Sequence, residues 1–380
     1  MATVIQQPET LCFSSLLSDI VFGTSADKGT VTLTVTCGGV SRTLIDETMY
    51  PDAAGHITLT ELPSLVEPYA RRYQQLTLGC SIDDSATSTP SITSISTVHV
   101  VYCACEIGVA SDAAAFIAGH FLTLLDGRRY TAPGRGELLS AYNGTYDQVE
   151  HAEEVPSVTV KVMAKVLDAN GRLDVMTFTG QVEPCNTAGI QHGQLLLYQF
   201  DASPRRMAAL YGISEDRLLA YTVWMGSRSQ DYVVVSDEKT PSPSLLFANS
   251  FGVGEILHCR GRHAKDSKYD RKSARINGVL RHYAIREDRQ FTAVTGWLSD
   301  AMALWADELF RSYEVYLWTE QGGIGREVII SDSKSVLTNV DDDLTNYEFT
   351  YTYAQRNHNV MSLPYMYDRL HNEPFNTTFN

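Results

Sequence analysis

Residues 245–257 read LLFANSFGVGEIL and place two glycines, Gly252 and Gly254, between two apolar runs. Such glycines occur in phosphate-binding loops, which would indicate a nucleotide-binding α/β fold, and also in turns between antiparallel strands. The stretch lacks the third glycine of the dinucleotide motif and the Lys-Ser/Thr pair of the P-loop. Both motifs also need a helix after the glycines, because the helix N-terminus binds the anion. Here residues 255–259 read EILHC, a strand pattern, so the stretch predicts strand–turn–strand.

The rest of the sequence has the same β character. Residues 30–36 read TVTLTVT, a strict alternation that predicts a half-buried strand. Asn170-Gly171 stands between the alternating runs 158–167 and 173–178, which predicts a hairpin. Twenty Tyr and 13 Phe among many Val and Thr suit pleated, half-buried surfaces. We therefore expect a mainly β protein, built from several antiparallel β-sandwich or barrel units with a few short helices.

A chain of 380 residues is too long for one ordinary core and indicates two or three domains. We expect an N-terminal β-domain over residues 1–108, a connector over 109–152, a second β-domain over 153–240 and a C-terminal β-rich domain over 241–380. Three short helices are predicted within this frame. They lie at residues 63–70, at residues 203–210 with Ser203 as N-cap and Pro204 in the first turn, and near residues 299–311 with Ser299 as N-cap.

Charge and cysteine usage exclude several classes of function. The net charge of −15 argues against general nucleic-acid binding, because phosphate backbones need a positive face. No apolar run is long enough to span a bilayer, and the first residues show no signal-peptide pattern. The seven cysteines are scattered, so we expect buried thiols rather than disulfides, including the pair Cys103 and Cys105, and synthesis in a reducing cytoplasm.

One segment departs from the acidic composition. Residues 260–275 carry about a quarter of the chain's Lys and Arg, against only Asp266 and Asp270. The cations are Arg260, Arg262, Lys265, Lys268, Arg271, Lys272 and Arg275. Two interpretations stay open. The segment is either a solvated hairpin loop between two strands, which is the simpler interpretation, or a basic loop that docks on an acidic partner such as a neighbouring subunit.

The sequence offers no catalytic, cofactor-binding or metal-binding residues above background, and we expect no enzyme activity. It contains no G-x-S-x-G and no H-E-x-x-H motif. Asp341-Asp342-Asp343 lacks the spacing of a calcium loop, and the carboxylates between Asp147 and Glu154 fit a solvated linker. Tyr130, Tyr142 and Tyr146 could stack on sugars, although core or interface packing is the simpler interpretation.

Several short motifs resemble proteins from the tail-gene clusters of tailed bacteriophages and prophages of gut bacteria. They are YPDAAGHI (50–57), NSFG (249–252) with Glu255 and a following basic loop, TGWL (295–298), SYEV (312–315), LTNYEFTY (344–351) and the FNTTFN ending (375–380). These motifs mark turns and strands at both ends of the chain, and the middle of the chain resembles that family only weakly.

The resemblance implies a structural virion protein of the tail tip or baseplate, similar in role to distal tail proteins, which form rings of β-domains. It implies assembly in the host cytoplasm, a place in the virion tail, and partners that are copies of the chain and neighbouring tail proteins, without nucleic acid or membrane insertion. The Ser/Thr-rich segment 84–94 and the connector 109–152 would then be candidates for ordering on assembly. The alternative is a tail-associated protein that binds or depolymerises a host-surface glycan.

Overall fold

A computed structural model describes residues 2–85, 91–105, 112–145, 157–185, 193–235, 242–319, 323–335 and 345–355. The described part confirms the predicted fold class, because it is mainly β, with several antiparallel sheets and short helices. Its buried apolar residues form three large cores and a smaller fourth cluster between them. We call the parts around the three cores the first unit (2–105), the second unit (112–235) and the third unit (242–355).

The first unit is a β-sandwich. Its elements are β1 (Thr3–Gln6), β2 (Leu11–Phe13), β3 (Ile20–Gly23), β4 (Gly29–Cys37), β5 (Val40–Met49), β6 (His56–Leu59), α1 (Leu62–Tyr73), β7 (Gln75–Asp83), β8 (Ile92–Ser94) and β9 (Val98–Val101). One sheet has the order β1-β3-β6 and the other β2-β9-β7-β4-β5, with β8 beside β7. The alternation in β4 buries Val31, Leu33 and Val35 against Phe22 and Ile57 of the facing sheet.

The second unit combines a five-stranded sheet with a separate strand pair. Its elements are α2 (Ala113–Gly119), β10 (Arg128–Thr131), β11 (Leu138–Thr145), β12 (Val158–Leu167), β13 (Leu173–Val182), β14 (Leu195–Asp201), α3 (Pro204–Tyr211), β15 (Leu218–Met225) and β16 (Arg228–Val234). The sheet order is β10-β16-β15-β12-β13, and β11 pairs with β14. The Asn-Gly hairpin is confirmed by β12 and β13, and Ser203 caps α3 as predicted.

The third unit is a seven-stranded sheet with two short helices. Its elements are β17 (Ser244–Ala248), β18 (Gly254–His258), β19 (His263–Ile276), β20 (Val279–Val294), α4 (Asp300–Ala306), α5 (Glu308–Arg311), β21 (Val315–Trp318), β22 (Ile324–Lys334) and β23 (Glu348–Tyr353). The order is β18-β17-β21-β22-β23-β20-β19. The helices cover the sheet through Trp305 and Leu309, which are buried against Phe247 and Phe349.

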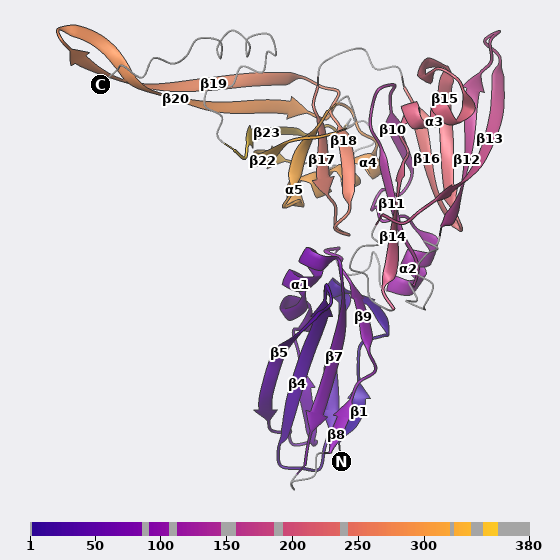
Figure 1. The fold of residues 1–380 in the computed structure, drawn as a ribbon, viewed down its shortest axis with the longest axis vertical. Coiled ribbons are helices and arrows are strands. Elements are labelled where there is room, and N and C mark those ends of the chain that lie inside the picture. Colours follow the sequence, from indigo (N-terminus) through magenta and orange to yellow (C-terminus); the bar gives the residue numbers. More distant parts are fainter. Residues whose placement is uncertain are drawn as a thin grey trace.

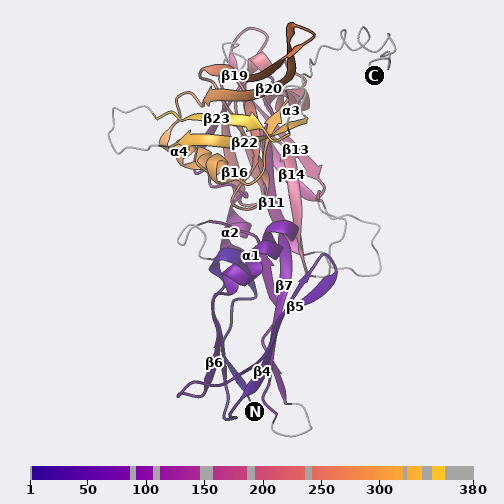
Figure 2. The same cartoon turned by 90° about the vertical axis from the view of Figure 1, so that its left-hand side faces the viewer.

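The fourth cluster lies where the three units meet. It brings together Phe13 of the first unit, Tyr142 of the second and Phe251 of the third, all fully buried. Cys103 and Cys105 belong to this cluster and are buried as predicted. The first unit lies at one end of the long axis, and the second and third units lie side by side at the other end (Figures 1 and 2).

Where the structure describes it, the segment expected as a connector, residues 109–152, is partly helical and partly extended. It contributes α2, β10 and β11 to the second unit, with β10 parallel to β16 and β11 antiparallel to β14. The reason is the alternation in β11, which buries Leu139 and Ala141 in the second core. Buried Arg228 also holds α2, because its guanidinium donates hydrogen bonds to the carbonyls of Ile117 and Tyr142.

Two expectations about local structure are corrected. The helix near residues 299–311 begins at the Ser299 cap, as predicted, but is divided at Asp307 into α4 and α5. The basic segment 260–275 is not a loop, because most of it forms β19, which pairs with β20 over its whole length. The expected loop 84–94 contains β8, while its residues 86–90 and the ending 375–380 lie outside the described residues.

Candidate functional site: a projecting arm and a buried ionic junction

The most prominent feature of the surface is the hairpin of β19 and β20, which we call the arm. These strands have 14 and 16 residues, and only the last four residues of β20 pair with β23. Beyond Phe291, toward the hairpin turn, the two strands pair only with each other among the described residues. The arm projects away from the body of the molecule (Figure 1). Its turn is Asn277-Gly278, where φ is 53° and 81°, the left-handed conformation that two-residue hairpin turns require.

Near the body, the charged side chains of the arm are paired with one another. Nε of Arg289 lies 2.6 Å from Oε1 of Glu287, and the hydroxyl of Tyr269 donates to the same carboxylate over 3.3 Å. The hydrogen bonds from Arg289 hold the pKa of Glu287 below its usual value. Arg286 makes a further pair with Asp288 at 3.3 Å. The carboxylates of Glu287 and Asp288 are therefore neutralised by arginines of the arm itself.

The tip of the arm, residues 271–286, has a different composition. It carries five cations and no carboxylate, and all five are exposed: Arg271, Lys272, Arg275, Arg281 and Arg286. Within the described residues, only Arg286 of these five makes an ion pair. Exposed apolar side chains lie among them, including Leu280 at 67% exposure and Tyr283 at 64%. The guanidinium of Arg271 lies 4.8 Å from the ring centre of Tyr269. An exposed surface of cations and apolar side chains is typical of a docking surface.

The structure brings five of the seven predicted site residues together. Lys265, Lys268, Arg271, Lys272 and Arg275 all lie on β19. Arg262 is exposed just before that strand, whereas Arg260 is half-buried and lines a cavity at the body. The cations of the return strand, Arg281, Arg286 and Arg289, were not predicted as part of the basic segment. The dipeptide Asn277-Gly278 between two β patterns was the signal that could have placed them beside the basic segment.

A buried ionic cluster joins the second unit to the third. Arg129 of β10 places Nη1 3.3 Å from Oε2 of Glu137 and Nη2 2.6 Å from Oε1 of Glu255 on β18. Its guanidinium also lies 4.3 Å from the ring centre of Trp305. Burial alone would lower the pKa of Arg129, but the charges of Glu255 and Glu137 outweigh burial and raise it. The guanidinium is thus a permanent charge inside the protein.

The stretch at 245–257 shapes this cluster. It forms β17, a turn and β18, which confirms the predicted strand–turn–strand. Asn249 fixes the turn, because its Oδ1 accepts hydrogen bonds from the backbone nitrogens of Phe251 and Val253. Its Nδ2 donates to the carbonyl of Leu122 over 2.7 Å and to Oε2 of Glu255 over 2.9 Å. The two glycines therefore serve a turn that holds a carboxylate against Arg129.

A Ser-His-Glu arrangement lies beside the cluster and was also missed in the sequence. Oγ of Ser244 lies 2.8 Å from Nδ1 of His258, and Nε2 of His258 lies 3.3 Å from Oε1 of Glu137. The hydroxyl of Ser244 also accepts a hydrogen bond from Arg135. Ser244 is only 8% exposed and is not among the described residues that line the neighbouring cavity. Its hydroxyl is held by Arg135 and His258, and Nε2 of His258 also lies 2.8 Å from the carbonyl oxygen of Gly136. The arrangement is typical of a structural network.

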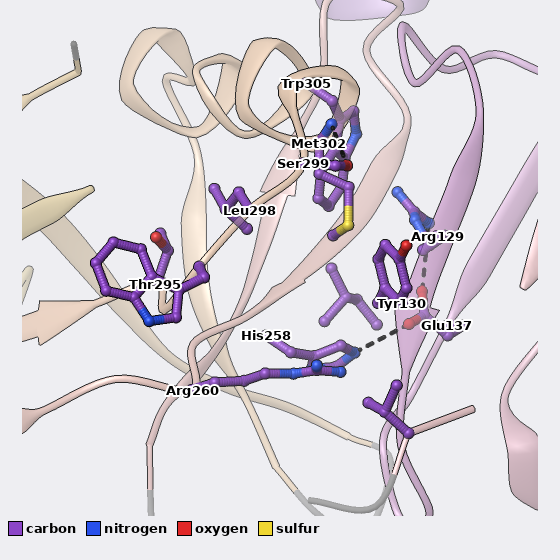
Figure 3. A pocket seen from close by; sticks show the side chains of 13 residues that line it. Arg129, Tyr130, Glu137, His258, Arg260, Thr295, Leu298, Ser299, Met302 and Trp305 are labelled. Carbon is purple, nitrogen blue, oxygen red and sulfur yellow. Dashed lines mark hydrogen bonds and ion pairs between the residues drawn. The ribbon is translucent and has the colours of Figure 1, made fainter. Parts of the chain in front are cut away.

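That cavity opens between the second and third units and has a volume of about 390 Å³ (Figure 3). Tyr130 and Glu137 line it from one side, and Ser299 and Met302 of the α4 region from the other. Trp297 belongs to the lining and is 65% exposed. Of the three tyrosines considered as sugar platforms, Tyr130 lies here, Tyr142 is buried in the fourth cluster, and Tyr146 lies outside the described residues.

Glu308 is a third buried carboxylate at the junction of the units, in addition to Glu137 and Glu255. Its Oε1 accepts a hydrogen bond of 2.9 Å from the backbone nitrogen of Ser250, and the side chain is 2% exposed. Burial, with the nearby charge of Glu255, raises the pKa of Glu308 to about 7. The protonation state of this residue therefore changes near neutral pH.

No protein-family model matches this sequence, and a search of curated proteins found no significantly similar one. The described helices include none with the length and apolar character to cross a bilayer. In the part of the chain that the structure describes, no three His, Cys, Asp or Glu side chains are grouped as metal ligands would be. The carboxylates between residues 147 and 154 and the Asp341–Asp343 run lie outside that part.

Proposed function

We propose that this chain is a structural subunit of a phage tail tip or baseplate, which joins neighbouring subunits through β-sheet contacts. The observation that carries the proposal is the arm, with its long exposed strands, an outer edge that pairs with no described strand, and its exposed cations. Exposed strand edges of this kind favour pairing with another chain. A protein that must remain monomeric usually shortens, covers or bends such an edge.

The buried junction supports the same role. Arg129 and Glu255 link the second unit to the third, and Gln74 and Gln75 of the first unit reach the other two by hydrogen bonds to Gly252 and Leu195. Ion pairs held in the dry interior fix geometry, because separating the partners leaves uncompensated charges. A rigid three-unit body suits a subunit that must hold its neighbours at a set spacing. Copies of the chain and other tail proteins are the proposed partners, within a virion assembled in the host cytoplasm.

Purified phage particles encoded by the same genome would test the proposal. Peptide mass spectrometry should detect the chain in the particles at a fixed ratio to the tail-tube protein. Cryo-electron microscopy should then reveal three-unit subunits with projecting arms at the tail tip. Particles that are infectious and contain no trace of the chain would contradict the proposal.

A second candidate function, binding or depolymerisation of a host-surface glycan, is favoured by the cavity beside Trp297. An exposed indole at a cavity of about 390 Å³ that also contains polar groups such as Glu137 and Arg260 is a common arrangement for stacking on a sugar ring. A glycan array followed by titration with the full chain would test it. Binding that is lost in Trp297→Ala and kept in Tyr313→Ala, an exposed aromatic elsewhere, would support this candidate. An array without any hit would argue against it.

A further inference from the structure

We infer that the tip of the arm docks on the β5 edge of the first unit in a second copy of this chain. The inference rests on the proposed function, since it names the contact through which the subunits would assemble. Four observations carry it: the charge of the tip, the charge of the first unit, the free strand edges, and the positions of both parts in the molecule.

Among the described residues, the only ion pair made by a cation of the tip is the exposed pair of Arg286 with Asp288. The arm carries eight Lys and Arg against four Asp and Glu, and those four carboxylates all lie outside the tip. The arm and the first unit lie at opposite ends of the long axis, and both views agree on this (Figures 1 and 2). The acidic first unit of one copy therefore lies far from that copy's own arm.

The first unit supplies the complementary charge. Residues 1–105 contain ten Asp and Glu against four Lys and Arg. Two of those four cations, Arg71 and Arg72, lie on α1 next to the junction, so the far end of the sandwich is more acidic still. Asp46 and Glu47 lie on β5 itself, and Asp52 follows it closely. A basic tip and an acidic sandwich attract each other at long range and favour a heterologous contact.

Strand edges of matching length are available on both sides. β5 ends its sheet and pairs only with β4, and all ten of its residues are exposed or half-exposed. β19 ends the sheet of the third unit, so its outer edge has no partner in the described structure. Pairing these two edges would satisfy backbone groups on both strands and place Arg271 and Arg275 near the carboxylates of β5.

Another free edge, β13, fits less well. It ends the sheet of the second unit and exposes Leu173 and Val175. However, the described residues 157–235 contain seven Lys and Arg and seven Asp and Glu, so this unit offers no net attraction for a basic tip. The other end strands of the first unit's smaller sheet, β1 and β6, carry no carboxylate, whereas β5 carries Asp46 and Glu47 against Arg42, so charge complementarity favours β5. A contact between two different surfaces generates a ring if the rotation closes and a helical array if it does not.

A charge exchange on the full chain would test the inference. One variant carries Arg271→Glu and Arg275→Glu on the arm, and the other carries Asp46→Lys and Glu47→Lys on β5. Each alone should weaken self-association at least about tenfold, because like charges then face each other. A mixture of the two variants should restore association, because the arm that has become acidic then meets the β5 surface that has become basic. The matched control is Lys161→Glu with Lys165→Glu on exposed positions of β12, which should not change association.

The readout is sedimentation velocity at about 50 mM and about 500 mM salt, since screening should dissociate the wild-type assembly. The salt dependence of the wild type needs no variant, so it remains informative if a variant folds poorly. Any one of three results would overturn the inference: a wild-type monomer at about 100 µM in low salt, arm variants that associate normally, or a mixture that fails to recover. A chain found in virions but monomeric alone would refute this contact and leave the proposed function standing. Self-association through the arm without incorporation into virions would support this contact and refute the proposed function.

Discussion

Nη2 of Arg129 lies 2.6 Å from Oε1 of Glu255, and this contact joins β10 of the second unit to β18 of the third. The two residues are 126 positions apart in the chain, and both side chains are less than 5% exposed. Trp305 and Asn249 donate hydrogen bonds to the other oxygen of the same carboxylate. This ion pair and its partners therefore help to fix the relative position of the two units.

Replacing Arg129 with Ala should destabilise the protein by about 3–5 kcal/mol, because Glu137 and Glu255 would remain buried without their cation. Urea unfolding followed by tryptophan fluorescence measures the loss, since Trp305 stacks on the guanidinium. Arg286→Ala is the matched control, as its pair with Asp288 is more than half exposed and should contribute nothing measurable. Equal stabilities for the Arg129 variant and the control would refute the structural role of the cluster.

Asn249→Asp isolates the role of the amide nitrogen. The carboxylate keeps an oxygen for the backbone of Phe251 and Val253, but it loses the donor to Glu255 and places a second negative charge about 2.9 Å from it. We expect a loss of about 2–4 kcal/mol at pH 8. The loss should shrink toward pH 5, where a protonated Asp can donate again. A pH-independent loss would show that the repulsion with Glu255 is not the cause.

Glu308→Gln should raise stability at high pH. The pKa of Glu308 is raised to about 7 in the folded protein, so folding favours the neutral carboxyl. That favourable contribution is complete below the unfolded-state pKa of about 4.3 and is lost as the pH rises through about 7. Gln stays neutral and can still accept from the Ser250 nitrogen. The variant should match the wild type at about pH 3.5 and exceed it by about 1–3 kcal/mol at pH 8. Thermal unfolding at both pH values checks this, and an unchanged difference across pH would contradict it.

Shortening the arm should leave the fold intact. Ser267 and Arg289 face each other in the hairpin, so Asn-Gly can replace residues 268–288 and close a two-residue turn between them. The removed residues are mostly exposed and contact none of the three large cores. The melting temperature of the shortened chain should therefore stay within about 2 °C of the wild type. A large decrease would show that the arm stabilises its own subunit and is not free for a partner.

The alternating sequences predicted the fold class because alternation reports directly which face of a strand is buried. Residues 30–36, the Asn170-Gly171 hairpin and the caps Ser203 and Ser299 all form the expected elements. For residues 109–152 the sequence could not show the sheet partners, since β11 pairs with β14, some 55 residues later in the chain. Pairing over that separation depends on the tertiary fold, which local periodicity does not contain. Whether residues 1–108, 153–240 and 241–380 fold independently stays a prediction.

The candidate site was predictable only in part. The density of Lys and Arg in residues 260–275 identified the basic segment, but its expected conformation was wrong because charged residues obscured the strand pattern of β19. The ionic cluster could not be predicted. Arg129, Glu137 and Glu255 look like ordinary surface residues in the sequence, and only the packing of β10 against β18 brings them together. The docking role of the basic residues, the absence of catalysis and the phage identity likewise stay predictions.

The most direct test of the account is sedimentation velocity on the full chain and the arm-shortened chain, at equal concentration in low salt. The account predicts that the full chain forms discrete oligomers and that the shortened chain is a folded monomer. Identical distributions for the two proteins, whether both are oligomeric or both monomeric, would contradict the claim that the arm joins one subunit to the next.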